Sequence, residues 1–151
     1  MISQIKQQGF TIVELLIVIV VIAILAALSY VGYTSITQRA NNSAAAAAAK
    51  AVADTAQNYQ GANGSYPISR AEFISGGSDP IAKMPSDIVF TGTTGGVTSA
   101  TGAAAYKTVM VEGCGTSPFT GLRITYRTGA ASIGVKNVGD VTSCASPTVL
   151  S

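Results

Sequence analysis

The chain has 151 residues, which is room for one domain. Only 11% of them are charged, about half the usual share, and the net charge of +2 is too small to predict nucleic acid as a bulk partner. Histidine is absent, so the most common general base near neutral pH, which is also the most common metal ligand, is missing. The composition therefore argues against an enzyme.

The N-terminal segment from Phe10 to Leu28 contains 19 residues, of which only Thr11 and Glu14 are polar. A helix of this length, at about 1.5 Å per residue, spans roughly 28 Å, close to the hydrocarbon core of a bilayer. Lys6 precedes the segment, and the next basic residue is Arg39. The positive-inside rule therefore keeps the N-terminus in the cytoplasm and predicts export of everything after the segment.

Three interpretations compete for this segment. It could be a secretory signal peptide, with Ala27-Leu28-Ser29 as the cleavage site, or a simple one-span anchor. Both leave Glu14 unexplained, because a carboxylate in an apolar run costs a few kcal/mol unless it is paired, protonated or at the interface. In the third interpretation the chain is cut between Gly9 and Phe10. The free α-amino group of Phe10 on a neighbouring copy then neutralises Glu14 and fixes the axial register between subunits.

The sequence GFTIVELL at residues 9–16 resembles the class III signal of type IV pilins and of their relatives, the pseudopilins of type II secretion and competence. This resemblance implies that a prepilin peptidase cuts after Gly9 and N-methylates Phe10. It also implies that Glu14 sets the assembly register. The leader Met1–Gly9 is short and carries Lys6, as in the type IVa group.

The helical pattern continues beyond the apolar segment to Tyr59, through the strong helix former Ala44–Ala49. Gly61, Gly64 and Pro67 then stop it. The sequence predicts one helix from Phe10 to about Gln60. We expect residues 10–28 to be its transmembrane and filament-core half, residues 29–60 to pack on a globular domain, and residues 61–151 to form that domain. The resemblance assigns this arrangement to the α+β pilin fold, in which one long helix packs on a small antiparallel sheet.

Shorter elements follow the long helix. Ser69 and Glu72 have capping-box spacing, which predicts a helix over Ser69–Ile74. Runs of β-forming residues predict four strands, with a hairpin turn at Gly129–Ala131; the strands are Ile88–Thr91, Tyr106–Glu112, Leu122–Arg127 and Ser132–Asn137. The Gly/Thr/Ser-rich stretch Gly92–Gly102 is predicted to be a surface loop.

The two cysteines, Cys114 and Cys144, predict one disulfide in an exported domain. Two thiols alone cannot make a four-ligand zinc site. Type IV pilins commonly close their C-terminal region with such a bond, so the resemblance implies the same structural role here.

No catalytic constellation, metal site or cofactor motif is evident, and the acidic residues are scattered. Two basic residues, Arg123 and Arg127, could share one outward face of the sheet, with Lys136 as a candidate third member. A solvated strand face is the simpler interpretation of these residues, and DNA is the alternative, without other support in the sequence.

We therefore expect a structural subunit of a type IV pilus, not an enzyme. It would be single-pass in the cytoplasmic (inner) membrane before assembly and in an extracellular filament afterwards. The family implies its partners: other pilin subunits, the prepilin peptidase, and the pilus assembly platform with its ATPase. A pseudopilin of type II secretion or competence is the nearest alternative. A secreted or membrane-tethered binding domain without a filament is the alternative from another class.

Overall fold

The computed structural model describes residues 9–77, 82–92, 94–100, 102–129, 132–144 and 148–150. The predicted leader lies outside the described residues except for Gly9, and so do the middle of the predicted hairpin turn (residues 130 and 131) and two residues of the predicted surface loop (93 and 101). The chain divides into two compact units, Met1–Thr37 and Gln38–Ser151. Each unit is described by itself.

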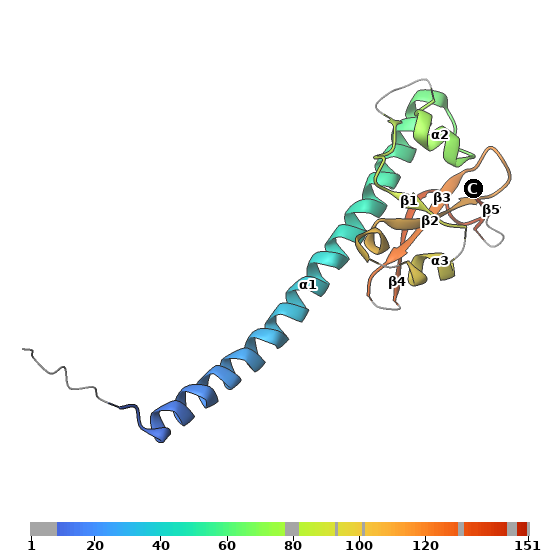
Figure 1. The fold of residues 1–151 in the computed structure, drawn as a ribbon. Helices are drawn as coiled ribbons and strands as arrows, with labels where there is room; N and C mark the ends of the chain where they lie inside the picture. Colours follow the sequence, from blue (N-terminus) through green and yellow to red (C-terminus); the bar gives the residue numbers. More distant parts are fainter. Residues whose placement is uncertain are drawn as a thin grey trace, which may run out of the picture. The chain divides into compact units, whose positions relative to one another are not determined.

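Helix α1 runs from Ile12 to Asn63 and passes through both units (Figure 1). No proline interrupts it, and its alanine run has the highest intrinsic helix propensity. It ends at Gly64, which has a φ of +78° and whose N–H donates to the Gln60 carbonyl at 2.8 Å. Glycine adopts this left-handed conformation without a Cβ penalty, so it terminates the helix. The prediction of one long helix is confirmed, with each end displaced by two or three residues.

Helix α2, Arg70–Ser75, confirms the predicted short helix. The Ser69 hydroxyl accepts a hydrogen bond from the Glu72 N–H at 3.4 Å, and the Glu72 carboxylate accepts one from the Ile68 N–H at 2.6 Å. The helix ends at Gly76, with a φ of +76°. Its buried residue, Phe73, has its ring centroid 5.4 Å from that of Phe90, which ties α2 to the sheet.

In the described part of the second unit, five strands form one sheet. They are β1 (Val89–Phe90), β2 (Thr108–Cys114), β3 (Gly121–Arg127), β4 (Ile133–Gly139) and β5 (Thr148–Val149). The order is β1-β2-β3-β4, and β5 also pairs with β2. The pairs β2–β3 and β3–β4 are antiparallel as expected, whereas β1 runs parallel to β2 and makes the sheet mixed. The sequence analysis did not predict β5.

One face of the sheet and the second half of α1 make the main core. Alanines and Val52 of the helix share one buried cluster with Val109, Val111, Leu122 and Ile124 of the central strands. These strand positions alternate along β2 and β3, so they lie on one face of the pleat. The small alanine side chains allow the helix and the sheet to approach closely. One long helix packed on a small sheet, with a disulfide near the C-terminus, matches the pilin fold.

The opposite face of the sheet corrects one prediction. The stretch expected to be a surface loop contains helix α3, Thr94–Ser99, followed by a 3₁₀ helix, η2, Gly102–Tyr106. Helix α3 contacts β2 and β3, and its Val97 is fully buried. Met110 and Thr125, which point away from the main core, are buried on this face. Glycine and threonine have weak helix propensity, so burial of Val97 outweighs local preference here.

Candidate processing and assembly site

The first turn of α1 lies at the start of an unusually apolar surface. In the described part of the chain, helix α1 is long and apolar enough to cross a membrane, judged by its length and composition alone. The aliphatic side chains from Ile12 to Leu28 are about half exposed or more, and Phe10 is 82% exposed. An isolated soluble protein does not present so much contiguous apolar surface to water. This segment therefore requires a lipid or protein environment.

Two polar side chains in this apolar segment bond to each other at the helix start. Thr11 precedes the first helical residue, and its hydroxyl oxygen accepts a hydrogen bond from the Glu14 N–H at 3.2 Å. The Glu14 carboxylate in turn accepts from the Thr11 N–H at 2.9 Å and from the Thr11 hydroxyl at 2.7 Å. This reciprocal arrangement is a capping box, which satisfies backbone N–H groups that have no partner within the helix.

The capping box changes the interpretation of Glu14. Sequence reasoning left its carboxylate without a partner in an uncut chain, but the structure gives it Thr11. The signal was present as the spacing T-x-x-E, the same spacing that predicted α2 from Ser69 and Glu72. The sequence analysis noted Thr11 as polar but missed its role as the cap of the helix.

Gly9 and Phe10, the residues on either side of the expected cleavage point, lie outside the helix and are exposed. A Cβ atom added to Gly9 would meet no other atom within 4 Å. The described part of the chain therefore imposes no packing requirement for glycine at this position. Any requirement for it must come from a partner that binds this segment.

Comparison with known protein families finds one match. Residues 5–30 fit the family model described as the prokaryotic N-terminal methylation motif. The chain carries a prepilin-type methylation motif. No curated protein and no solved structure matches the chain significantly. The motif covers Gly9, Phe10, the capping box and the apolar part of α1. The family match therefore falls on the same residues as the exposed Gly9–Phe10 bond and the cap described above.

A prepilin-type motif, together with the pilin fold, is consistent with a type IV pilin-like protein. It supports a substrate of prepilin peptidase of the pilin or pseudopilin kind, and it implies assembly into pilus-type filaments. The motif belongs to structural pilin-type proteins and not to an enzyme family. Its apolar helix also fits anchoring in a membrane.

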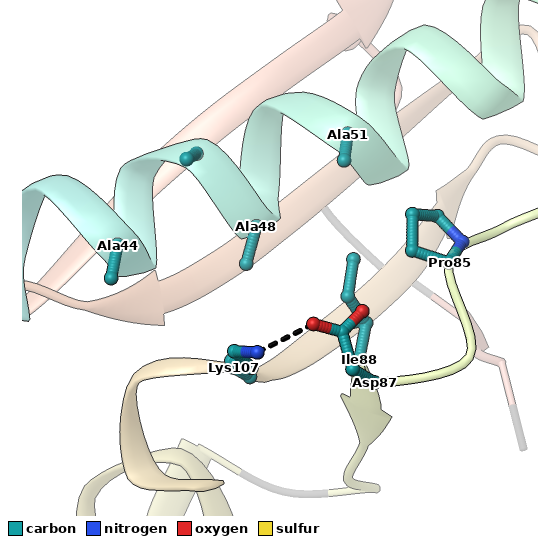
Figure 2. Close-up of a pocket in the computed structure, with 8 residues that line it drawn as sticks. Ala44, Ala48, Ala51, Pro85, Asp87, Ile88 and Lys107 are labelled. Carbon is teal, nitrogen blue, oxygen red and sulfur yellow. Dashed lines mark hydrogen bonds and ion pairs between the residues drawn. The ribbon is translucent and has the colours of Figure 1, made fainter. Parts of the chain in front are cut away.

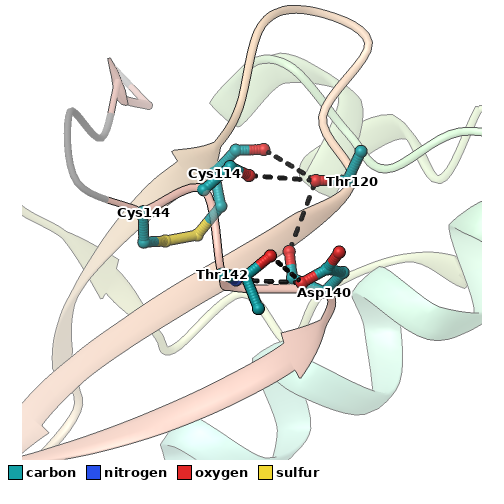
Figure 3. The surroundings of a disulfide bond; sticks show 6 residues. Cys114, Thr120, Asp140, Thr142 and Cys144 are labelled. Atoms are coloured by element: carbon teal, nitrogen blue, oxygen red, sulfur yellow. Dashed lines mark hydrogen bonds between the residues drawn. A yellow bond between two sulfur atoms is a disulfide. The ribbon is translucent and has the colours of Figure 1, made fainter.

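The C-terminal part of the second unit is closed by a disulfide between Cys114 and Cys144 (Figure 3). The Thr120 hydroxyl lies 3.3 Å from the carbonyl oxygens of both Cys114 and Asp140, and the Asp140 N–H donates to the Thr120 carbonyl at 3.0 Å. The Asp140 carboxylate accepts from the hydroxyl and the N–H of Thr142, at 2.7 and 2.9 Å, and these bonds lower the pKa of Asp140. Hydrogen bonds and the disulfide together fix this region structurally.

A groove of about 380 Å³ lies in the second unit between α1 and the segment before β1 (Figure 2). Most of its lining is small or apolar, contributed by Ala44, Ala47, Ala48, Ala51, Pro85 and Ile88. Lys107 and Asp87 complete it with an ion pair of 2.5 Å, which lowers the pKa of Asp87. Both charges are already paired, and no group of three potential metal ligands occurs in the described parts of the chain.

The structure keeps two of the three basic residues on one face of the sheet and places the third on the other. Lys136 lies opposite Ile124, so it is on the sheet face of the main core, while Arg123 and Arg127 are on the other face. Arg127 donates to the carbonyls of Gly129 and Ala100, at 2.6 and 2.7 Å. The guanidinium of Arg127 therefore connects segments of its own chain, and Lys136 is not part of the same surface.

Proposed function

We propose that this protein is the precursor of a structural subunit of a type IV pilus. The prepilin peptidase cuts between Gly9 and Phe10 and N-methylates Phe10, which removes the leader Met1–Gly9. Residues 10–28 hold the subunit in the cytoplasmic membrane before assembly and form the filament core afterwards. The observation that carries this proposal is the match of residues 5–30 to the methylation motif, on a helix whose apolar side chains are exposed.

The remaining parts of the chain have corresponding roles in this proposal. Residues 29–60 pack on the globular domain of residues 61–151, which faces outward in an extracellular filament. Other pilin subunits are the partners of the apolar helix, and an assembly platform with its ATPase supplies the machinery. Burial of apolar surface, at about 25 cal/mol per Å², is the driving free energy once the helix leaves the lipid.

Glu14 acts in this proposal as the register residue. Once the leader is removed, the α-amino group of Phe10 is a cation at nearly the depth of the carboxylate. Bringing that group on one subunit against Glu14 on the next neutralises both charges in apolar surroundings, where an unpaired charge is costly. Thr11 can be exchanged for this stronger partner because its own bonds to Glu14 involve no opposite charge.

The first test is the intact mass and N-terminal sequence of the mature protein. A start at N-methylated Phe10 supports the proposal. A start at Tyr30 would mean that a signal peptidase removed the apolar helix segment with Glu14, and the proposal would fail. Gly9→Val gives a matched variant, because a Cβ atom added at Gly9 meets no described atom within 4 Å. Loss of processing in this variant would therefore reflect the peptidase and not misfolding.

A pseudopilin of type II secretion or competence shares the same motif and the same processing. The location of the assembled filament separates the two functions. Abundant filaments sheared from the cell surface and containing this chain support a pilus subunit, whether it serves adhesion, twitching motility or another task. Short assemblies retained in the cell envelope would support a pseudopilin.

A further inference from the structure

We propose that Thr11 is a positioning residue for maturation. The capping box that it forms with Glu14 starts α1 at Ile12 and so keeps the peptide bond between Gly9 and Phe10 outside the helix. This inference rests on the proposed function, because it concerns the same cleavage. It adds a role for a side chain that forms part of neither the cut bond nor the register pair.

The reason lies in the hydrogen bonds of a helix. Hydrolysis adds water at the Gly9 carbonyl carbon, breaks the bond to the Phe10 nitrogen, and leaves a Gly9 carboxylate and a Phe10 amine that takes up a proton. If α1 began two residues earlier, the Gly9 carbonyl would accept the Val13 N–H in the regular four-residue pattern. The bond to be cut would then be part of a helical turn, and the peptidase would have to unwind it.

Thr11 has the only side chain here that can cap the helix, since Gly9 tolerates an N-cap position but has no side-chain acceptor. Thr11 has the only polar side chain between Gly9 and Val13. A helix leaves its first four N–H groups without a partner within the helix, and in apolar surroundings each such group costs several kcal/mol. The Thr11 hydroxyl accepts the Glu14 N–H at the present start, and the apolar side chains around an earlier start offer no such acceptor.

Substitutions at position 11 separate capping from direct recognition by the peptidase. Thr11→Val keeps the shape of the side chain and removes the hydroxyl. Thr11→Ser and Thr11→Asn both restore an N-cap acceptor, but only serine restores a hydroxyl. Thr37→Val is the matched control, because the Thr37 hydroxyl bonds the Tyr33 carbonyl within the helix and has no part in the cap.

The experiment measures cleavage of the full-length precursor, in detergent, by a prepilin peptidase. We expect Thr11→Val to raise KM about fivefold, the factor for about 1 kcal/mol of lost capping, with kcat nearly unchanged. Thr11→Ser, Thr11→Asn and Thr37→Val should be cleaved like the wild type. Hydrogen exchange of the amides of residues 10–13 in the same precursors should show an added helical turn in Thr11→Val alone.

Two results would overturn the inference. If Thr11→Val is cleaved with wild-type constants, the cap has no role in maturation. If Thr11→Asn is as poor a substrate as Thr11→Val, the peptidase recognises the hydroxyl itself and capping is not the cause. Failure of the proposed function would look different, because the wild-type precursor itself would then not be cut between Gly9 and Phe10.

Discussion

At the scale of single residues, Glu14 combines two physical roles that one substitution can separate. Its carboxylate caps the start of α1 through Thr11, and its charge is the proposed partner of the Phe10 amine. A glutamine at the same position retains an oxygen that can accept the Thr11 N–H, and capping boxes accept either residue. Only the charge is lost.

We therefore predict that Glu14→Gln matures normally and assembles poorly. Leaving the Phe10 ammonium without a counter-charge in an apolar bundle should reduce incorporation at least about tenfold, since breaking a buried charge pair costs about 3–5 kcal/mol. The measurement compares the Phe10-starting product in membranes with the protein in sheared filaments. If Glu14→Gln were found in filaments at wild-type amounts, the charge of Glu14 would not be needed to set the register.

Arg127 shows how one side chain can connect distant segments. Its Nε and Nη1 atoms donate to two carbonyls, and its guanidinium lies over the Tyr106 ring at 5.5 Å. The planar guanidinium presents these donors in a fixed geometry that the lysine ammonium cannot reproduce.

Arg127→Lys should therefore lower the free energy of unfolding by about 1–3 kcal/mol, the range for hydrogen bonds made by charged groups. Denaturant unfolding of the mature protein in detergent measures this change. Arg123→Lys on the same face is the control, with an expected change within about 0.5 kcal/mol. Equal effects at the two positions would contradict the bridging role of Arg127.

At the scale of elements, local patterns predicted most of the fold. Three patterns each predicted the right element: the helical periodicity of α1, the capping spacing at Ser69, and the alternation of apolar and polar residues in β3. They succeeded because the interactions behind them join residues only a few positions apart in the chain. Helix α3 and strand β5 were not predicted, since a glycine-rich turn of helix and a two-residue strand form only against a sheet that is already present. The motif of residues 9–16 identified the candidate processing site, but the Thr11 cap escaped notice although its spacing was readable.

The β3–β4 hairpin contains a glycine at a position where the backbone leaves no room for a side chain. A Cβ atom at Gly121 would lie 2.3 Å from the Asp140 carbonyl oxygen, which is part of the backbone and cannot move aside cheaply. We predict that Gly121→Ala destabilises the protein by about 1–3 kcal/mol, as overpacking does. Gly92→Ala, where an added Cβ meets nothing within 4 Å, should change stability by less than about 0.5 kcal/mol. Thermal unfolding of both variants tests the difference.

At the scale of the whole molecule, stability should depend on pH only towards the extremes. Hydrogen bonds from Lys107 and from Thr142 lower the pKa values of Asp87 and Asp140 below their usual 3.8. Burial, with the Glu72 carboxylate nearby, raises the pKa of Tyr59 above 10.0. Histidine, which would titrate between these limits, is absent.

The two carboxylates therefore add stability above about pH 4, and this contribution is lost as the pH falls through their lowered folded pKa values. The contribution of neutral Tyr59 is complete below about pH 10 and is lost as the pH rises through its raised value. We predict a flat unfolding midpoint between pH 5 and 9 (roughly the interval free of these groups). Asp87→Asn should weaken the acid-side fall. A midpoint that slopes steadily across neutral pH would contradict this assignment.

The order of strands along β2 has a consequence for how the chain acquires its structure. One edge of β2 is completed by β1, which precedes it, and by β5, which comes more than thirty residues later. The alanine face of α1 is synthesised well before any of these strands. During synthesis the alanine face therefore remains without the strands that later cover it. Contacts between residues so far apart in the sequence form slowly. Slow closure prolongs exposure of apolar surface, and a chaperone would matter most during that interval.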